Sequence, residues 1–196
     1  MLIVRSDAEA VEADLAAGLL LCPSCQDGAL ARWGFARRRE LRDGTALRPR
    51  RAACLAEGGC GATHVLLPDT CLARRRDRAE VIGTAITAVF AGSEAYTDTA
   101  CRLGVPPDTV FEWLRRFRRR AGVIASHFSA WLVALAPGGP LPEPEGRPAR
   151  HALELIGAVA RAASLRLGAR PAWSWASALT GGALLSNTSS PFVAPA

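Results

Sequence analysis

The chain has 196 residues, and 49% of them are hydrophobic, which is enough to bury one core or two small ones. Arginine accounts for all 24 basic residues, which stand against 18 acidic ones and leave a formal charge of +6. No apolar run reaches the roughly 18 residues of a membrane helix. The acidic residues Asp7, Glu9 and Glu12 do not fit a secretory signal peptide. We therefore expect a cytoplasmic, nucleoid-associated protein with no membrane partner.

The arginines are clustered along the chain. Tight groups occur at residues 37–39, 48–51, 74–76 and 115–120. Clustered positive charge is typical of a chain that meets an anionic partner, most often nucleic acid. A solvated basic face is the alternative for any single cluster.

The first segment, residues 1–71, combines a short helix with β-like runs. Ser6 and Glu9 have the S-x-x-E spacing of a capping box, which predicts a helix that ends near Gly18. From residue 19 onward, short runs are separated by turn signals such as Asp43-Gly44. These β-like runs are residues 19–21, the ALARWGFAR and ALRPRRAAC stretches, and THVLLP at 63–68.

Four cysteines in this segment have the layout of a zinc ribbon. Cys22 and Cys25 form one C-x-x-C pair, and Cys54 and Cys60 supply a second pair after 28 intervening residues. Thiolates suit zinc because four soft sulfur ligands satisfy its tetrahedral geometry, and metal binding holds together a β-unit too small to fold alone. The loop between Cys54 and Cys60 is longer than the usual spacing of about two to four residues, so we expect it to bulge outward.

His64 and Cys71 are alternative ligands. We interpret His64 as a strand histidine that faces solvent, and Cys71 as an ordinary small residue, because zinc knuckles keep their ligands close in sequence. A thioredoxin-type redox pair at Cys22 and Cys25 requires a βαβ context, which the hairpin-like pattern does not offer. Zinc is the cofactor that the sequence predicts.

Residues 72–136 are expected to be helical and to contain a helix-turn-helix unit. A helix over about residues 80–91 is followed by a shorter one over about residues 97–103. Gly104 then turns the chain, and Pro107 begins a third helix, where proline is tolerated in the first turn. This order of elements is that of a helix-turn-helix.

If this unit binds double-stranded DNA, its third helix lies in the major groove with its N-terminal residues at the base edges. Glu112 can accept a hydrogen bond from a cytosine amino group, Arg115 can bind guanine, and Phe111 can touch a thymine methyl group. The residues expected near the bases are Pro107, Asp108, Thr109, Phe111, Glu112 and Arg115, and those expected at phosphates are Arg116, Arg118, Arg119 and Arg120. The alternative is a three-helix bundle whose arginine-rich surface binds protein.

The stretch PGGPLPEPEGRP predicts a linker, which we place at residues 137–150. Beyond it, residues 151–196 predict amphipathic helices and a loose tail. The apolar stripes of these helices are expected to complete a core, with an exposed homodimer seam as the alternative. The predicted fold is therefore mainly α, with a small N-terminal zinc-ribbon β-unit, a three-helix helix-turn-helix unit and C-terminal helices.

Seven motifs that cover nearly the whole chain share a pattern with one family: CPSC, RWGFARRRELR, LRPRRAAC, THVLLP, RRRDRAEVIGTAI, LGVPPDTVFEWLRRF and TGGALL. Together they resemble an actinobacterial family of zinc-ribbon and helix-turn-helix proteins, a domain of unknown function. The front part is also similar to the DNA-binding region of insertion-sequence transposases. The resemblance implies a zinc ribbon carried by Cys22, Cys25, Cys54 and Cys60 and a DNA-binding unit over residues 96–116. This chain departs from the family pattern in the long second cysteine loop and at Thr99 and Phe111, where an aliphatic residue and an arginine are more typical.

No group of residues in the sequence predicts catalysis. A three-carboxylate transposase needs acids that converge on two metal ions, but after residue 121 the only acids are Glu143, Glu145 and Glu154. The histidines stand in no recognisable nucleophile motif. We expect a zinc-containing DNA-binding protein, transposase-like or regulator-like, with no enzymatic activity and no small-molecule substrate. The alternative is an interaction module that binds a transposase or a polymerase subunit.

Overall fold

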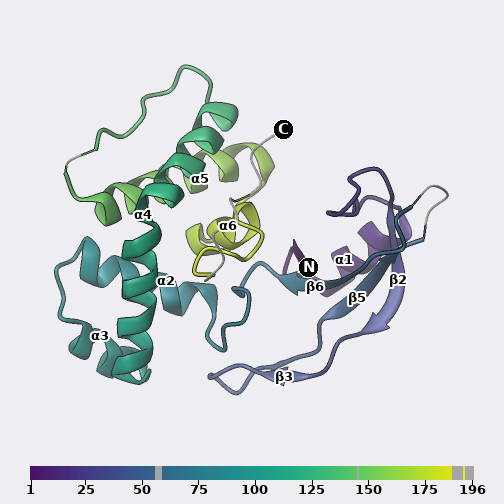
Figure 1. Ribbon diagram of the computed structural model, residues 1–196, viewed down its shortest axis with the longest axis horizontal. Coiled ribbons are helices and arrows are strands. Elements are labelled where there is room, and N and C mark those ends of the chain that lie inside the picture. The colour runs from purple at the N-terminus through teal and green to yellow at the C-terminus, as the bar shows by residue number, and fades with distance from the viewer. Residues whose placement is uncertain (56–58, 145, 187–191, 193–196) are drawn as a thin grey trace.

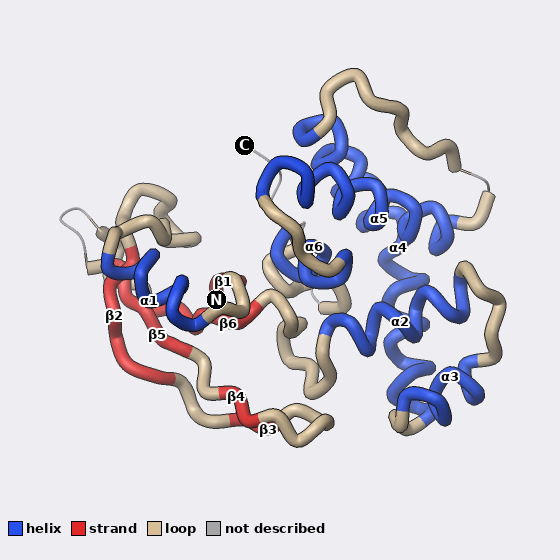
Figure 2. The backbone as a smooth tube through the Cα atoms, turned by 180° about the vertical axis from the view of Figure 1, so that it is seen from behind, coloured by secondary structure: helices blue, strands red, loops and turns tan. Residues whose placement is uncertain are grey.

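The computed structural model describes residues 1–55, 59–144, 146–186 and 192, and it shows a small β part beside a larger helical part (Figure 1). The N-terminal elements are β1 (Leu2–Val4), α1 (Ala8–Ala16), β2 (Leu30–Phe35), β3 (Arg39–Glu40), β4 (Ala46–Leu47), β5 (Arg50–Cys54) and β6 (Thr63–Pro68). Four strands form a sheet in the order β1-β6-β5-β2, in which β1 runs parallel to β6 and the other pairs are antiparallel. Strands β3 and β4 form a separate hairpin, which extends beyond this sheet (Figure 2).

Helix α1 packs on the four-stranded sheet. Its N-terminus is capped by Asp7, whose carboxylate accepts hydrogen bonds from two first-turn backbone N–H groups at 3.0 and 3.1 Å. The expectation that Ser6 caps this helix is wrong by one residue, because Asp7 is an equally good capping residue and its carboxylate makes both bonds. Val11 and Leu15 face the sheet and are buried with its apolar side chains.

Strand β1 is an element that the sequence does not predict. Residues 2–4 pair with residues 66–68 in parallel register. Three residues are too few to show the alternation of apolar and polar residues that identifies a strand. Strand β1 can therefore be recognised only from its pairing with β6. The predicted run at residues 19–21, in contrast, is reduced to a single bridge between Leu21 and Ala29, because the chain turns there.

The described chain beyond residue 78 is largely helical, which confirms a mainly α fold class with a small mixed sheet. The helices are α2 (Ala79–Phe90), α3 (Tyr96–Leu103), α4 (Pro107–Leu135), α5 (Pro148–Leu167) and α6 (Ala172–Leu179). Helix α4 is one continuous helix of 29 residues, so the segment after the predicted third helix extends it. Within the described ranges, no helix combines the length and the apolar character that crossing a bilayer requires.

One hydrophobic core joins the helices on both sides of the Pro/Gly-rich segment. Helix α4 packs along α5, and both contribute to a buried cluster that extends from Leu72 to Phe192. Trp173 of α6 lies so close to Gly83 of α2 that a Cβ atom at Gly83 would be 2.0 Å from the indole ring. The apolar stripes of α5 and α6 are therefore buried within the chain.

The predicted turn at Asp43-Gly44 is confirmed as the tip of the β3–β4 hairpin. Gly44 has a φ of +79°, a conformation that glycine adopts without steric cost. The Asp43 carboxylate accepts a hydrogen bond from the backbone N–H of Thr45 at 2.9 Å and forms an ion pair with Arg78 at 2.6 Å. Because Arg78 immediately precedes α2, this ion pair attaches the hairpin to the helical part.

Polar contacts also join the four-stranded sheet to the C-terminal helices. Arg170 pairs with the buried carboxylate of Asp69 at 3.0 Å, and its guanidinium lies 4.6 Å from the centre of the Trp175 ring. The hydroxyl of Ser177 donates to the backbone carbonyl of Cys71 at 2.6 Å. The segment that follows β6 is therefore held against α6.

Candidate metal centre and nucleic-acid interface

Four cysteines converge beside the four-stranded sheet. Cys22 and Cys25 lie in the loop before β2, Cys54 ends β5, and Cys60 lies in the loop before β6. Their sulfur atoms all lie within 4.8 Å of one another. The structure thus brings together the four residues that the sequence predicts as one ligand set.

The sulfur separations fit tetrahedral thiolate coordination. The Sγ atoms of Cys22 and Cys60 are 3.7 Å apart, as are those of Cys25 and Cys54. A regular tetrahedron with metal–sulfur bonds of about 2.3 Å has sulfur–sulfur edges of about 3.8 Å. Disulfide bonds measure about 2.05 Å, so these cysteines are free thiols. The cluster can therefore hold a metal ion through four sulfur atoms.

Backbone hydrogen bonds close the two loops that carry the cysteines. In the first, the backbone N–H of Cys22 donates to the carbonyl of Gly28 at 2.8 Å, and in the second the N–H of Gly61 donates to the carbonyl of Cys54 at 3.1 Å. A Cβ atom at Gly28 would lie 2.3 Å from the Sγ of Cys54, so this close approach requires glycine. The predicted outward bulge of the second loop falls on residues 56–58, which lie outside the described residues.

The thiols of the two pairs differ in acidity. Hydrogen bonds from the backbone N–H groups of Gly28 and Asp27 lower the pKa of Cys25 to about 6. Burial raises the pKa of Cys54 to about 11. The first pair is therefore the more anionic at neutral pH, and a metal ion that takes all four as thiolates displaces protons from the second pair.

His64 is buried beside this cluster, and the expectation that it faces solvent is wrong. Only 6% of the residue is exposed, and its Nε2 lies 3.3 Å from the Sγ of Cys22. The alternation along β6 was the signal that could have located it, because His64 is two residues from the buried Leu66 and alternate residues share a face. Burial lowers the pKa of His64, so its ring is neutral and can donate a hydrogen bond to the sulfur. Cys71 packs in a separate apolar cluster.

Four thiolate ligands would complete a tetrahedral coordination sphere and leave no position for a substrate. The arrangement therefore suits a structural site. The surrounding core is small, and two of the ligands belong to it: its buried members are Val11, Leu15, Cys22, Leu30, Ala52, Cys54 and Leu66. An ion at this place would link the loops before β2 and β6 to the end of β5.

A tight turn connects α3 to α4. Gly104 has a φ of +63°, and the backbone N–H of Val105 donates to the carbonyl of Ala100 at 3.0 Å, which ends α3. Pro107 then occupies the first turn of α4, as the sequence predicts. Helices α2, α3 and α4 pack against one another, and α3 lies beside the N-terminal end of α4 (Figure 1).

Thr99 fills a core position of α3 although it is polar. The residue is fully buried, and its hydroxyl donates to the backbone carbonyl of Ala95 at 3.1 Å. The hydrogen bond within its own helix satisfies the hydroxyl, so Thr99 presents its methyl group to the core at little cost.

The predicted DNA-contacting residues occupy the first turns of α4, where one side of the helix is buried and the other is exposed. The buried side consists of Val110, Trp113, Leu114 and Phe117. The exposed residues are Pro107, Asp108, Phe111, Arg115, Arg118 and Arg119, and the partly exposed ones are Thr109, Glu112 and Arg116. The start of α4 therefore presents a basic surface to solvent.

Two of the predicted base-contacting residues bind each other. The carboxylate of Glu112 pairs with Arg115 at 2.7 Å and also with Arg116. The hydrogen bonds from Arg115 are the main reason that the pKa of Glu112 falls to about 2. Phe111 contacts the ring of Tyr96 in α3, with ring centres 5.8 Å apart. Base contacts by Glu112 or Arg115 would therefore require their ion pair to open.

Several clustered arginines serve the fold. Arg75 donates to the carbonyl of Leu185 at 2.6 Å, and Arg120 donates to the carbonyl of Ser186 at 3.1 Å. These two arginines hold the C-terminal segment against the helical core. The exposed members of the clusters include Arg37, Arg38, Arg39, Arg74, Arg76, Arg115, Arg118 and Arg119.

The tip of the β3–β4 hairpin lies beside the α3–α4 turn. Arg42 and Asp43 from the hairpin line one cleft of about 220 Å³ together with Gly104 and Val105 from the turn. Figures 1 and 2 show the hairpin and α3 at the same edge of the molecule. The hairpin tip and the α3–α4 turn therefore lie on neighbouring parts of the surface.

No family model, curated protein or solved structure matches this chain. The resemblance to zinc-ribbon and helix-turn-helix proteins therefore stays a prediction. The four converging cysteines and the exposed arginines of α4 are the two features of this chain that point to a function.

Proposed function

We propose that this chain is a zinc-stabilised protein that binds double-stranded DNA without catalysing a reaction. In this proposal the N-terminal sheet is a zinc ribbon, helices α2 to α4 form a helix-turn-helix, and the start of α4 enters the major groove. One observation carries the proposal: directly after a tight turn, α4 has one fully buried side and one exposed side that bears arginines.

Zinc is the metal that best suits the four cysteines. Soft thiolate ligands favour zinc, copper(I) or iron–sulfur clusters, and a closed tetrahedral set of four sulfur atoms is typical of structural zinc. Because the apolar core around the cysteines is small, the binding energy of the ion would contribute directly to folding of the sheet. Removal of zinc should therefore unfold the sheet before the helical core.

Two arginine groups would contact the same duplex. Arg118 and Arg119 on α4 are exposed, and in this proposal they would meet phosphates when the helix lies in the groove. The exposed arginines at 37–39, which lead into the hairpin, would meet the adjacent backbone. Arg115 would contact guanine only after its ion pair with Glu112 opens, and Glu112 would then keep Arg116 as its partner.

In-vitro selection from a random duplex pool, with zinc-loaded full-length protein, tests this proposal. We expect an enriched motif, and a palindrome with half-sites about one helical turn apart would show that the protein binds as a homodimer. For about five phosphate contacts, the affinity for duplex DNA should fall about 500-fold between about 50 and 200 mM salt.

Three single substitutions separate base contacts from phosphate contacts. Arg115→Ala should change the enriched motif, whereas Arg119→Ala should weaken binding equally on every sequence. Arg166→Ala, at an exposed position in the last turn of α5, is the matched control and should change neither the enriched motif nor the affinity. Absence of duplex binding at low salt would contradict the proposal and favour the protein-interaction module.

A further inference from the structure

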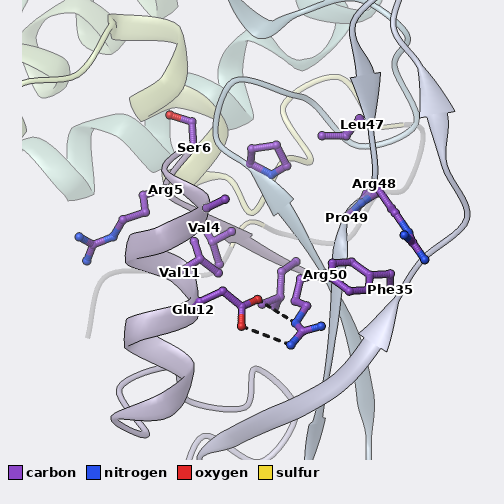
Figure 3. Close-up of a pocket in the computed structure, with 13 residues that line it drawn as sticks. Val4, Arg5, Ser6, Val11, Glu12, Phe35, Leu47, Arg48, Pro49 and Arg50 are labelled. Atoms are coloured by element: carbon purple, nitrogen blue, oxygen red, sulfur yellow. Dashed lines mark hydrogen bonds and ion pairs between the residues drawn. The ribbon is translucent and has the colours of Figure 1, made fainter.

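A small pocket lies between α1, β1 and the β4–β5 segment (Figure 3), and its lining includes no cysteine and no residue of α4. Its volume is about 160 Å³. The walls are largely apolar and consist of Val4, Val11, Leu47, Pro49, Leu66 and Pro68. Charged side chains line the rest: Arg5, Glu12, Arg48 and Arg50, together with the ring of Phe35. The pocket thus combines an apolar interior with a charged, aromatic mouth.

The size of the pocket suits one planar ring. An apolar protein cavity of about 150 Å³ holds a benzene molecule. A single six-membered ring therefore fits the pocket, whereas a two-ring purine would extend out of it.

One cation at the mouth is free to meet an anion. Phe35 is 50% exposed and lies between two guanidinium groups, that of Arg48 at 4.7 Å and that of Arg50 at 4.5 Å from the ring centre (Figure 3). Arg50 is neutralised by Glu12, with Nε and Oε1 2.9 Å apart. No carboxylate in the described part of the chain pairs with Arg48. Arg48 can therefore leave the ring for a phosphate and lose only an exposed cation–π contact.

Glu12 offers the pocket one unused acceptor site. A carboxylate has about four lone-pair sites. Arg50 donates one hydrogen bond to Oε2 at 3.2 Å, while its Nε lies 2.9 Å from Oε1 and the Nε of Arg32 lies 2.8 Å from Oε2 as ion-pair contacts, so Oε1 keeps acceptor capacity. This acceptor favours a ring that carries an amino donor and disfavours one that presents a carbonyl in the same place.

We infer that this pocket binds a cytosine base of single-stranded nucleic acid, with its amino group on Glu12 and a flanking phosphate on Arg48. Cytosine is a single-ring base with an exocyclic amino donor, whereas thymine presents a carbonyl at that position. A base stacked in a duplex cannot enter, so the ligand is a single strand. The ring of Phe35 and the exposed Trp33, two residues earlier on β2, supply stacking surfaces for neighbouring bases.

Fluorescence anisotropy with short labelled oligodeoxycytidylate and oligothymidylate tests the inference on zinc-loaded full-length protein. We expect oligodeoxycytidylate to bind about tenfold more tightly than oligothymidylate, because cytosine can donate its amino group to the charged carboxylate where thymine presents a carbonyl. Phe35→Leu, which removes the ring but keeps an apolar side chain, should weaken the binding of oligodeoxycytidylate about tenfold. Arg48→Gln should also weaken it and reduce its salt dependence, whereas Arg38→Gln, at an exposed arginine that does not line the pocket, should have a smaller effect.

These measurements distinguish this site from the proposed duplex-binding surface, on which it does not depend. Phe35→Leu should leave duplex binding unchanged, and Arg115→Ala should leave oligodeoxycytidylate binding unchanged. Equal affinity for the two oligonucleotides, or an unaltered affinity of the Phe35→Leu protein, would overturn the inference. Loss of duplex binding alone would count only against the function proposed above.

Discussion

The imidazole Nε2 of His64 lies 3.3 Å from the sulfur of Cys22. His64 belongs to β6 and Cys22 to the loop before β2, so this contact joins two separate segments beside the cysteine cluster. A neutral imidazole that donates to a thiolate ligand orients the sulfur and offsets part of its charge without entering the coordination sphere. His64 is therefore a positioning residue in this account, and Cys22 remains the ligand.

Substitution of His64 should weaken metal binding without abolishing it. We expect His64→Ala to lower the zinc affinity about 10- to 100-fold, which is the usual effect of removing a hydrogen-bond partner of a metal ligand. Competition with a chromophoric chelator measures this change. Thr63→Ala, at an exposed position on the same strand, should leave the affinity unchanged. An unaltered affinity in the His64→Ala protein would show that the contact has no role at the site.

Two glycine-to-alanine substitutions should have opposite effects on stability. A Cβ at position 28 would collide with the Cys54 sulfur at 2.3 Å, so Gly28→Ala should displace that ligand and destabilise the zinc-loaded protein by about 1–3 kcal/mol. Gly122 lies on the exposed side of α4, and a Cβ atom added there would have no other side chain within 4 Å, so Gly122→Ala should stabilise the protein by about 1 kcal/mol. Urea unfolding in the presence of zinc measures both changes. An unchanged urea midpoint for the Gly28→Ala protein would mean that the Cys54 sulfur does not lie close to the backbone of residue 28.

Neutralisation of Glu112 should strengthen duplex binding. Glu112→Gln removes a negative charge and releases Arg115 and Arg116, so we expect a roughly threefold to tenfold gain in affinity at low salt. Glu154→Gln disrupts a comparable pair with Arg150 on α5 and should leave duplex binding unchanged. Anisotropy titrations of both proteins provide the comparison.

The gain in duplex affinity from Glu112→Gln should be independent of pH in the neutral range. Because the folded-state pKa is lowered to about 2, the ion pair contributes fully to stability above the unfolded value of about 4.3, and this contribution is lost as the pH falls through about 2. Wild-type Glu112 is thus ionised from about pH 5 to about pH 8, and the gain should be constant over this range. A gain that shrinks toward pH 5 would show that Glu112 is already protonating there.

Local signals allowed much of this architecture to be predicted from the sequence. Gly104 and Pro107 located the α3–α4 turn, and the spacing of the cysteines identified four residues that the structure brings together. The Asp43-Gly44 signal located the hairpin turn. Each of these signals depends on a few residues that are close in sequence, so it can be recognised without knowledge of the fold.

The features that were missed depend on partners distant in sequence. Strand β1 forms because it pairs with β6, which lies about 60 residues later in the chain. His64 is buried beside Cys22, which lies 42 residues earlier in the loop before β2. Arg75 and Arg120 looked like surface charge, but their carbonyl partners are separated from them by 110 and 66 residues. Sequence clustering alone does not distinguish such structural arginines from those that remain exposed.

The central claim is that four thiolates hold one zinc ion beside the sheet, and X-ray absorption spectroscopy at the zinc edge tests it most directly. The full-length protein, purified with its metal, should show one zinc surrounded by four sulfur atoms at about 2.3 Å, with no nitrogen ligand at about 2.0–2.1 Å. Three sulfur atoms and one nitrogen would place His64 in the coordination sphere and contradict the assignment of four cysteine ligands. A protein that folds fully and retains no metal would contradict the claim altogether.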